Sequence, residues 1–218
     1  MKSYISLLEK IKLFDEISEE DIITMLTCLN AKIDNYKKGQ FILMAGTKVE
    51  NIGIVLEGQA HIIKESMEGE RIIISVLDKG DYFAEALCCA VVEASPVSVQ
   101  AINDTKIMFL NFSRILHTCP NSCLFHTKLI ENMLFVLASK NLTLQNRMDI
   151  ITQKTLRLKV LSYLNFLSDK QGNKIIIPFN REGLADFLCV DRSSLSHELS
   201  RMKEDGLIEF YKNKFEIL

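Results

Sequence analysis

The chain has 218 residues, of which 48% are hydrophobic and 25% are charged, with three prolines and six cysteines. This composition, without any low-complexity run, excludes extensive disorder and predicts a globular protein of one large or two small domains. No apolar run reaches the length of a membrane span, and the amphipathic start is unlike a secretory signal. We therefore expect a cytoplasmic protein that makes no membrane contact and whose cysteines are reduced thiols.

The formal net charge of −2 is divided unevenly along the chain. Residues 150–218 carry 11 Lys and Arg against 9 Asp and Glu, which gives +2, whereas residues 1–149 carry 15 against 19, which gives −4. The sign favours nucleic acid as a partner of the C-terminal part, but the charge is small. Binding is therefore expected to need a local basic surface and two copies of the chain. The basic residues expected there are Lys154, Arg181, Arg192, Arg201, Lys203, Lys212 and Lys214.

The N-terminal part is predicted to be a β-domain between about residues 35 and 112. Six short runs rich in β-branched residues are separated by turn signals, a spacing typical of a sandwich or barrel. The runs are F-I-L-M-A, I-G-I-V-L-E-G, A-H-I-I-K, R-I-I-I-S-V-L, V-S-V-Q-A and K-I-M-F-L. A jelly roll fits them, with Gly58, Gly69 and Gly80 at corners where the backbone reverses.

A long helix is predicted next, from about residue 121. Apolar residues and one asparagine recur in it at alternating steps of four and three, which indicates a parallel coiled coil between two copies of the chain. The stripe consists of Ile130, Leu134, Leu137, Asn141, Leu144, Met148 and Ile151. Asn141 either bonds its symmetry mate and fixes the register or is an ordinary surface residue. A hinge at residues 149–153 and an amphipathic helix over residues 155–167 follow.

Residues 179–218 have the pattern of a helix-turn-helix followed by a wing. Asn180 is expected to cap a first helix, and residues 189–191 are expected to form the turn, with Asp191 capping a second helix. Gly206 ends that helix, and the segments 207–210 and 214–218 read as the two strands of a wing. The residues expected to face inward are Leu184, Ala185, Leu188, Leu195, Leu199 and Met202.

The opposite face of the second helix carries short or forked polar groups near the helix start, where recognition helices contact base edges. The sequence therefore predicts double-stranded DNA as the partner. The residues expected to contact it are Arg181, Arg192, Ser193, Ser196, His197, Arg201 and Lys212. The alternative is a small helical domain that packs on another protein.

This order of elements resembles the CRP/FNR family of bacterial transcription regulators over nearly the entire chain. The stretch I-V-L-E-G-Q-A-H-I-I-K-E-S-M-E-G-E-R-I-I-I-S-V-L-D-K-G-D-Y-F-A-E also resembles that family's hairpin and the start of its ligand cassette. The resemblance implies an α+β fold with a cyclic-nucleotide-binding-like β-roll (jelly-roll) sensor at 1–120, a dimerisation helix at 121–149 and a winged helix-turn-helix DNA-binding domain at 150–218. It also implies a homodimer on an inverted-repeat promoter site, a signal sensed by the roll, and RNA polymerase as a further partner if the protein is an activator.

The family's cyclic-nucleotide cassette survives only in part. It reads G-E and, nine residues later, R-S-A, with the arginine pairing the cyclic phosphate and the glutamate the ribose hydroxyl. In this chain Glu85 matches, but Ala84 replaces the glycine, and Ser95, Pro96 and Val97 stand in place of R-S-A. Burying a phosphate without its guanidinium partner costs on the order of several kcal/mol, so cyclic AMP is disfavoured.

Another small-molecule effector is expected in the roll instead, and its identity is unknown. The residues that the resemblance places beside it are Phe83, Glu85, Ser95 and Ser98. The alternative for Glu85 is a bond to backbone within the roll.

One segment with two cysteines, residues 117–126, could hold a metal or take part in redox chemistry. The family's iron-sulfur branch uses an N-terminal cysteine cluster, and the first cysteine here is the isolated Cys28, so such a cluster is disfavoured. The segment H-T-C-P-N-S-C-L-F-H places four soft ligands within ten residues, namely His117, Cys119, Cys123 and His126. Their spacing matches no common zinc-finger pattern, so the default is an ordinary apolar segment without metal.

The function indicated by the whole sequence is that of a dimeric, DNA-binding transcription regulator. A cytosolic ligand-binding or scaffold protein without specific DNA binding is the rival. An enzyme is least supported, because the sequence offers no nucleophile with a base, no phosphate-binding loop and no clustered carboxylates.

Overall fold

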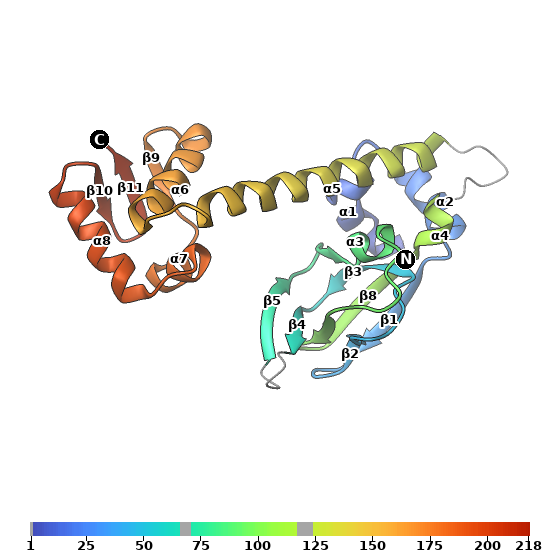
Figure 1. Ribbon diagram of the computed structural model, residues 1–218. Coiled ribbons are helices and arrows are strands. Elements are labelled where there is room, and N and C mark those ends of the chain that lie inside the picture. The colour runs from blue at the N-terminus through green and yellow to red at the C-terminus, as the bar shows by residue number, and fades with distance from the viewer. Residues whose placement is uncertain (1, 66–70, 117–123) are drawn as a thin grey trace. The chain divides into compact units, whose positions relative to one another are not determined.

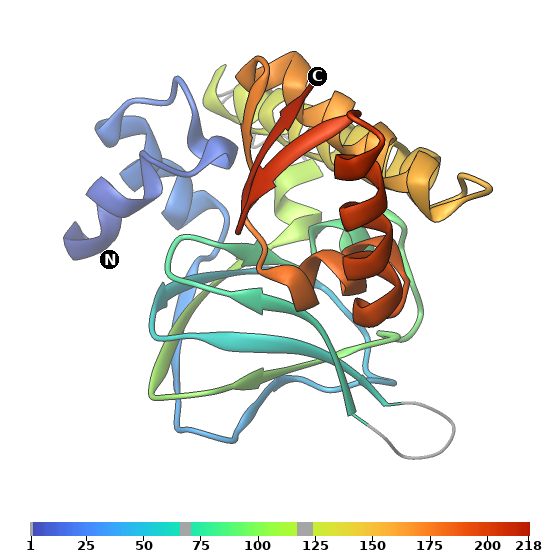
Figure 2. The ribbon, with the colours of Figure 1, turned by 90° about the vertical axis from the view of Figure 1, so that its left-hand side faces the viewer.

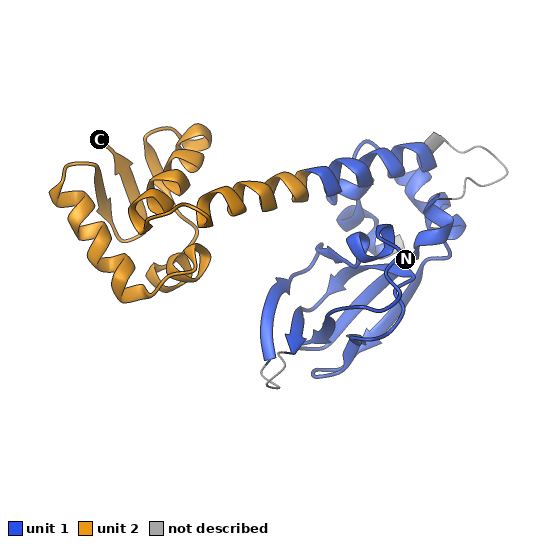
Figure 3. Ribbon diagram, in the orientation of Figure 1, with its two compact units in different colours: residues 1–138 blue, residues 139–218 orange. Residues whose placement is uncertain are grey.

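The structure is a computed structural model that describes residues 2–65, 71–116 and 124–218 (Figure 1). It divides into two compact units, residues 1–138 and 139–218 (Figure 3). The first unit contains the predicted β-domain, and the second contains the predicted helix-turn-helix. The long helix α5 (Leu124–Ile151) contributes residues to both units.

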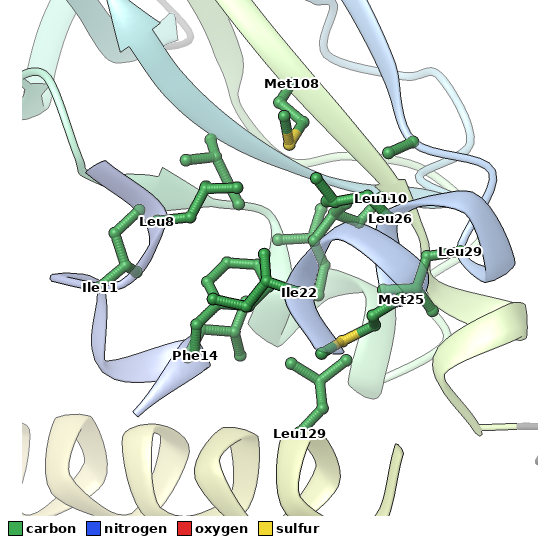
Figure 4. Close-up of a cluster of buried hydrophobic side chains, with 14 of the residues drawn as sticks. Leu8, Ile11, Phe14, Ile22, Met25, Leu26, Leu29, Met108, Leu110 and Leu129 are labelled. Carbon is green, nitrogen blue, oxygen red and sulfur yellow. The ribbon is translucent and has the colours of Figure 1, made fainter. Parts of the chain in front are cut away.

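The first unit begins with short helices that cover one face of the β-domain. They are η1 (Lys2–Tyr4), α1 (Ile5–Leu8), η2 (Lys12–Phe14) and α2 (Glu19–Cys28). Ser18 caps α2, because its hydroxyl oxygen accepts a hydrogen bond from the backbone N–H of Asp21 at 3.2 Å. Their apolar side chains form one buried cluster with residues of β3, β8 and α5, including Leu129 of α5 (Figure 4).

Among the described residues, eight strands form the roll as two antiparallel sheets (Figure 2). The strands are β1 (Lys32–Tyr36), β2 (Phe41–Leu43), β3 (Asn51–Glu57), β4 (Ala60–Glu65), β5 (Arg71–Leu77), β6 (Tyr82–Phe83), β7 (Ser98–Ala101) and β8 (Thr105–Asn111). One sheet has the order β1-β8-β3-β6 and the other β2-β7-β4-β5. The six predicted strands are present. Two were not predicted, because β1 is mostly polar and β6 has only two residues.

Strand β3 is buried on both faces, which explains its unbroken apolar run. Ile52, Ile54 and Leu56 pack on the helices, whereas Val55 faces the interior of the roll. Gly53 pairs with Phe83, and a Cβ at Gly53 would lie only 2.1 Å from the Phe83 ring. Only glycine therefore allows Phe83 to fill the interior at this point.

The predicted corner at Gly58 has a clear physical basis. Its φ of +82° favours glycine, and a Cβ there would lie 2.4 Å from the carbonyl oxygen of Asp104. Gly80 also has a positive φ, of +94°. Gly69 lies outside the described residues.

Helix α3 (Glu85–Cys89) lies between β6 and β7 in the chain. Helix α4 (Phe112–Leu116) follows β8 directly, and α5 comes after α4. Helix α5 buries Leu129, Met133 and Val136 in the first unit and Ile150 in the second. Across residues 2–65, 71–116 and 124–218, no helix is long and apolar enough to cross a membrane.

The second unit is a helical domain with a small sheet. Its elements are α6 (Leu156–Gln171), β9 (Lys174–Ile176), α7 (Arg181–Leu188), α8 (Arg192–Glu204), β10 (Ile208–Tyr211) and β11 (Lys214–Ile217). The sheet has the order β10-β11-β9, so β9 is a third strand beside the predicted wing hairpin. Strand β9 was not predicted from the sequence, because it has only three residues. The predicted hinge at 149–153 is displaced, because α5 continues to Ile151 and the break before α6 covers residues 152–155.

Candidate nucleic-acid interface and effector site

Helices α7 and α8 are joined by the predicted tight turn. The side-chain oxygen of Asn180 accepts a hydrogen bond from the backbone N–H of Gly183 at 2.8 Å, which caps α7. The chain then reverses at Cys189, whose φ of +53° is left-handed, and the N–H of Val190 bonds back to the carbonyl of Ala185 at 3.0 Å. Asp191 occupies the N-cap position of α8 in extended conformation, although its side chain makes no capping bond.

Helix α8 has the two faces that the sequence predicted. Leu195, Leu199 and Met202 are fully buried in the core of the second unit. The polar residues on the opposite face, Arg192, Ser193, Ser196 and His197, are all exposed. Within the described parts of the chain, the side chains of Arg192, Ser193 and His197 have no hydrogen-bond or ion-pair partner. These groups are therefore available to an external partner.

An arginine of α6 fixes the position of α8. The Nε of Arg157 lies 2.6 Å from Glu198 Oε1, and its Nη1 lies 2.6 Å from Asp205 Oδ2. Glu198 is half-buried, and this pairing keeps its carboxylate away from the exposed polar face. No local pattern predicts this contact, because Arg157 and Glu198 are 41 positions apart.

The wing is attached to α7 through Arg181. Its guanidinium carbon lies 5.1 Å from the ring centroid of Phe210 and 5.6 Å from that of Phe215. Its Nη2 also donates a hydrogen bond of 3.5 Å to the carbonyl of Lys212 in the wing turn. Burial lowers the pKa of Arg181. The predicted DNA contact Arg181 is thus engaged with aromatic rings and backbone, whereas Arg201 and Lys212 are exposed.

Comparison with known proteins agrees with both units. Residues 33–122 match the model of a cyclic nucleotide-binding domain, and residues 158–218 match a Crp-like helix-turn-helix domain. The two matches together span most of the chain. The chain belongs to the CRP/FNR family of transcription regulators. No relative among curated proteins matches it by sequence.

Solved structures share the fold of this CRP/FNR-family chain. The catabolite activator protein of Thermus thermophilus is 18% identical with a TM-score of 0.52, and the alignment covers 95% of this chain and 93% of that one. The regulator DNR of Pseudomonas aeruginosa is 19% identical with a TM-score of 0.50, covering 100% and 95%. The sensor domain of DNR alone is 18% identical with a TM-score of 0.54, covering 71% and 96%.

The residues predicted beside an effector are mostly occupied by the fold of the roll. The hydroxyl of Ser95 donates to the carbonyl of Val97 at 2.7 Å, and the hydroxyl oxygen of Ser98 accepts from the N–H of Ala45 at 2.9 Å. Glu85 is buried and interacts within the fold. Phe83 is buried too, but it forms part of the wall of a cavity. Of the four residues, Phe83 is the one that lines this cavity.

Three of the four candidate metal ligands, His117, Cys119 and Cys123, lie outside the described residues. His126 is 1% exposed, and its two ring nitrogens have no partner among residues 2–65, 71–116 and 124–218. Burial lowers the pKa of His126. In the same part of the chain, no group of three or more metal-ligating side chains occurs. Burial raises the pKa of the Cys88 thiol to about 12, which makes it a poor nucleophile.

The predicted dimerisation stripe is split between burial and exposure. Ile130 and Leu137 are half-buried against the core of the first unit. Leu134, Leu144 and Met148 are exposed, at 63%, 62% and 57%, and Asn141 is exposed as well. Two further apolar residues that the heptad pattern did not include, Phe135 and Leu142, are 63% and 60% exposed. Helix α5 thus carries a long apolar surface that nothing within the chain covers, as far as the structure describes it.

Proposed function

We propose that this CRP/FNR-family chain is a DNA-binding transcription regulator that reads an inverted-repeat site as a homodimer. The observation that carries the proposal is the polar face of α8, whose side chains have no partners among the residues that the structure describes, while the apolar face beneath them is fully buried. Such a helix presents rigidly held, free hydrogen-bonding groups, which is what readout of base edges requires.

Within the interface, we assign different tasks to the basic residues. Arg192 is the base reader, because its forked guanidinium suits the O6 and N7 acceptors of guanine. Ser193, Ser196 and His197 contact neighbouring bases or phosphates, and exposed Arg201 and Lys212 contact phosphates. Arg181 supports the wing turn that carries Lys212, because its guanidinium already lies against Phe210 and Phe215.

The homodimer is proposed from the exposed apolar surface of α5. Five large apolar side chains between residues 134 and 148 are at least 57% exposed on one helix. Contiguous apolar surfaces of this kind mark association sites, and the alternating spacing is that of a coiled coil. A paired α5 also presents two copies of α8 to the two half-sites of an inverted repeat.

The signal is proposed to be something other than a cyclic nucleotide. Ser95 stands where the family's phosphate-binding arginine is expected, and its hydroxyl is already bonded to the backbone of Val97. No guanidinium is therefore present at this position to pair with a cyclic phosphate.

Selection of bound sequences from random duplex DNA tests the function. The full chain is incubated with the library with its thiols reduced or oxidised, and with or without added zinc. We expect enrichment of an inverted repeat whose binding weakens steeply with salt, because phosphate contacts release counterions. Enrichment that depends on thiol state or zinc would assign a role to Cys119 and Cys123. Weak, salt-insensitive binding without any enriched sequence would favour a ligand-binding or scaffold protein.

A further inference from the structure

A cavity of about 440 Å³ opens at one end of the roll, away from the residues of the family's cassette other than Phe83 and Ala84. Its apolar wall includes Phe83 and Phe109, which both pair with Gly53 of β3 from opposite sides in one sheet, and Ile42 and Leu43 of the other sheet. Its polar wall comes mainly from β1 and from the ends of the strands beside it. The volume lies within the range of about 300–1,000 Å³ that is typical of small-molecule sites.

Among the described residues, the polar wall carries one positive and one negative side chain without an ion-pair partner, Lys32 and Asp34, and both are exposed. Lys32 and Asp34 both line the cavity and lie two residues apart in β1, so their side chains emerge on the same side of the strand. Among the described residues, neither side chain has an ion-pair or hydrogen-bond partner. The other charged pair of the wall, Lys48 and Glu50, is already joined at 2.7 Å. That ion pair raises the pKa of Lys48 and lowers that of Glu50.

This arrangement selects the charge of a ligand. An anion at Lys32 meets the carboxylate of Asp34 next to it, and a cation at Asp34 meets the ammonium of Lys32. A molecule with both charges and an apolar group satisfies both residues and places the apolar group against Phe83 and Phe109. A nucleotide, which carries only negative charge on its phosphates, does not.

We infer that this cavity is the effector site and that it binds a free amino acid with an apolar side chain. The carboxylate lies at Lys32, the ammonium at Asp34 and the side chain against the aromatic wall. The inference of an effector rests on the proposed function, because it requires that DNA binding is regulated.

One residue of the cavity connects it to the helices that lead out of the roll. Asn111 lines the cavity, and its side-chain oxygen accepts a hydrogen bond from the backbone N–H of Arg114 at 3.1 Å, at the start of α4. Its side-chain nitrogen donates to Asn51 Oδ1 at 3.5 Å across the cavity wall. Arg114 in turn donates to the carbonyl of Cys28 at 3.2 Å. A ligand that competes for the Asn111 amide therefore acts on the start of α4, the helix that precedes α5 in the chain.

Isothermal titration of the full chain with L-leucine, L-methionine and L-phenylalanine tests the site. We expect at least one of them to bind with one molecule per chain. Its amide, which lacks the carboxylate, and its N-acetyl form, which lacks the ammonium, should each bind at least about tenfold more weakly, because each loses a charge-assisted hydrogen bond. Lys32→Ala and Asp34→Asn should weaken binding by a similar factor. Lys38→Ala, a matched lysine outside the cavity, should leave it unchanged.

The absence of binding by all three amino acids overturns the inference, as does binding that Lys32→Ala and Asp34→Asn leave unchanged. Equal binding of the amide or N-acetyl form overturns the assignment of the charges. The role as effector is measured separately, as a change of at least about threefold in affinity for the selected DNA site when the amino acid is bound, and Asn111→Ser should reduce this change. Amino-acid binding without any such change overturns the effector role. If the chain binds amino acids but no specific DNA in either state, the proposed function fails and the site stands.

Discussion

The two units of this CRP/FNR-family chain use their polar residues in opposite ways. At the start of α8, Arg192 and Ser193 have no partners among the described residues and stand above a fully buried apolar face. In the roll, the hydroxyl groups of Ser95 and Ser98 form hydrogen bonds to the backbone. The charged side chains without an ion-pair partner among the described residues of the cavity wall are Lys32 and Asp34 of β1. Arg192 and Ser193, which are predicted to read DNA, are thus free among the described residues, whereas two of the residues predicted beside an effector bond to the backbone.

This difference shows which functional residues can be predicted from their positions in a family's motif. A reading surface occupies a few consecutive turns of one helix, so its residues remain together whenever the helix forms. A ligand site in a roll is assembled from several strands, so its residues come together only through long-range pairing. Position in a motif therefore predicts the DNA-binding residues more directly than it predicts the residues beside an effector, and both assignments stay predictions.

The largest expected effect comes from breaking the surface of α5. Leu144 is 62% exposed in the predicted seam, and Leu144→Glu places like charges opposite one another in a paired helix. We expect sedimentation velocity to show a change from dimer to monomer. Affinity for the selected inverted repeat should fall by at least about a hundredfold, because two linked reading heads bind as a unit. Gln145→Glu adds the same charge to the exposed neighbour outside the seam and should leave the dimer intact. A dimeric Leu144→Glu chain would contradict the predicted seam.

Loss of the contact between α6 and α8 should have the next largest effect. Arg157→Ala leaves Glu198 and Asp205 without their shared cation, so the thermal midpoint of the second unit and the affinity for specific DNA should both fall. The exchanged pair Arg157→Glu with Glu198→Arg should recover part of the affinity. Lys170→Ala, in the last turn of the same helix, is the control. Equal midpoints for Arg157→Ala and wild type would show that α8 is positioned by its apolar face alone.

The two cationic residues near the wing turn should have different roles: Lys212 contacts a DNA phosphate, and Arg181 stabilises the wing. Lys212→Ala should reduce the slope of log affinity against log salt by about one per chain, because one phosphate contact is lost. Arg181→Lys should change the salt slope less but lower the stability of the wing, because a lysine cannot stack on Phe210 and Phe215 as a guanidinium does. If Arg181→Lys alone reduces the slope, Arg181 is a phosphate contact after all.

The buried His126 should give the smallest effect, a dependence of stability on pH in the first unit. Its pKa is lowered by burial, so the folded state holds it neutral. Below the ordinary histidine pKa of about 6.5, the unfolded chain takes up a proton that the folded chain does not, and stability falls as the pH decreases. His126→Leu should flatten the dependence of the thermal midpoint on pH between about 8 and 5.5. An unchanged dependence would show that other groups dominate it.

Much of the fold could be predicted from the sequence, for reasons that particular residues make clear. The caps at Asn180 and the turn at Cys189 are encoded locally, and the apolar spacing of α8 requires a helix. The strand β1 could not be predicted, because its residues are mostly polar and its pairing with β8 is set by partners more than 60 positions away. The same long-range pairing creates the cavity at Lys32 and Asp34, which no local pattern marks.

The apolar stripe of α5 shows a second limit. The alternating spacing identified Ile130 and Leu137 as seam residues, but both pack partly on the core of the first unit. Phe135 and Leu142 lie seven positions apart and are exposed, although the strict pattern omitted them. A helix that serves both a core and a partner carries two overlapping stripes, and spacing alone cannot assign each residue to one of them.

The most direct test of the central claim is the affinity of Arg192→Ala for the selected site and for variants of that site with one base pair changed in each half. If Arg192 reads a guanine, the variant should bind the selected site about 5- to 150-fold more weakly per half-site, matching about 1–3 kcal/mol of discrimination. At the base pair that Arg192 reads, the variant should also bind the selected site and the altered site with equal affinity. Circular dichroism and thermal midpoint should match wild type, because Arg192 is exposed and unpartnered among the described residues. Unchanged affinity and unchanged base preference would contradict the assignment of α8 as the reading helix.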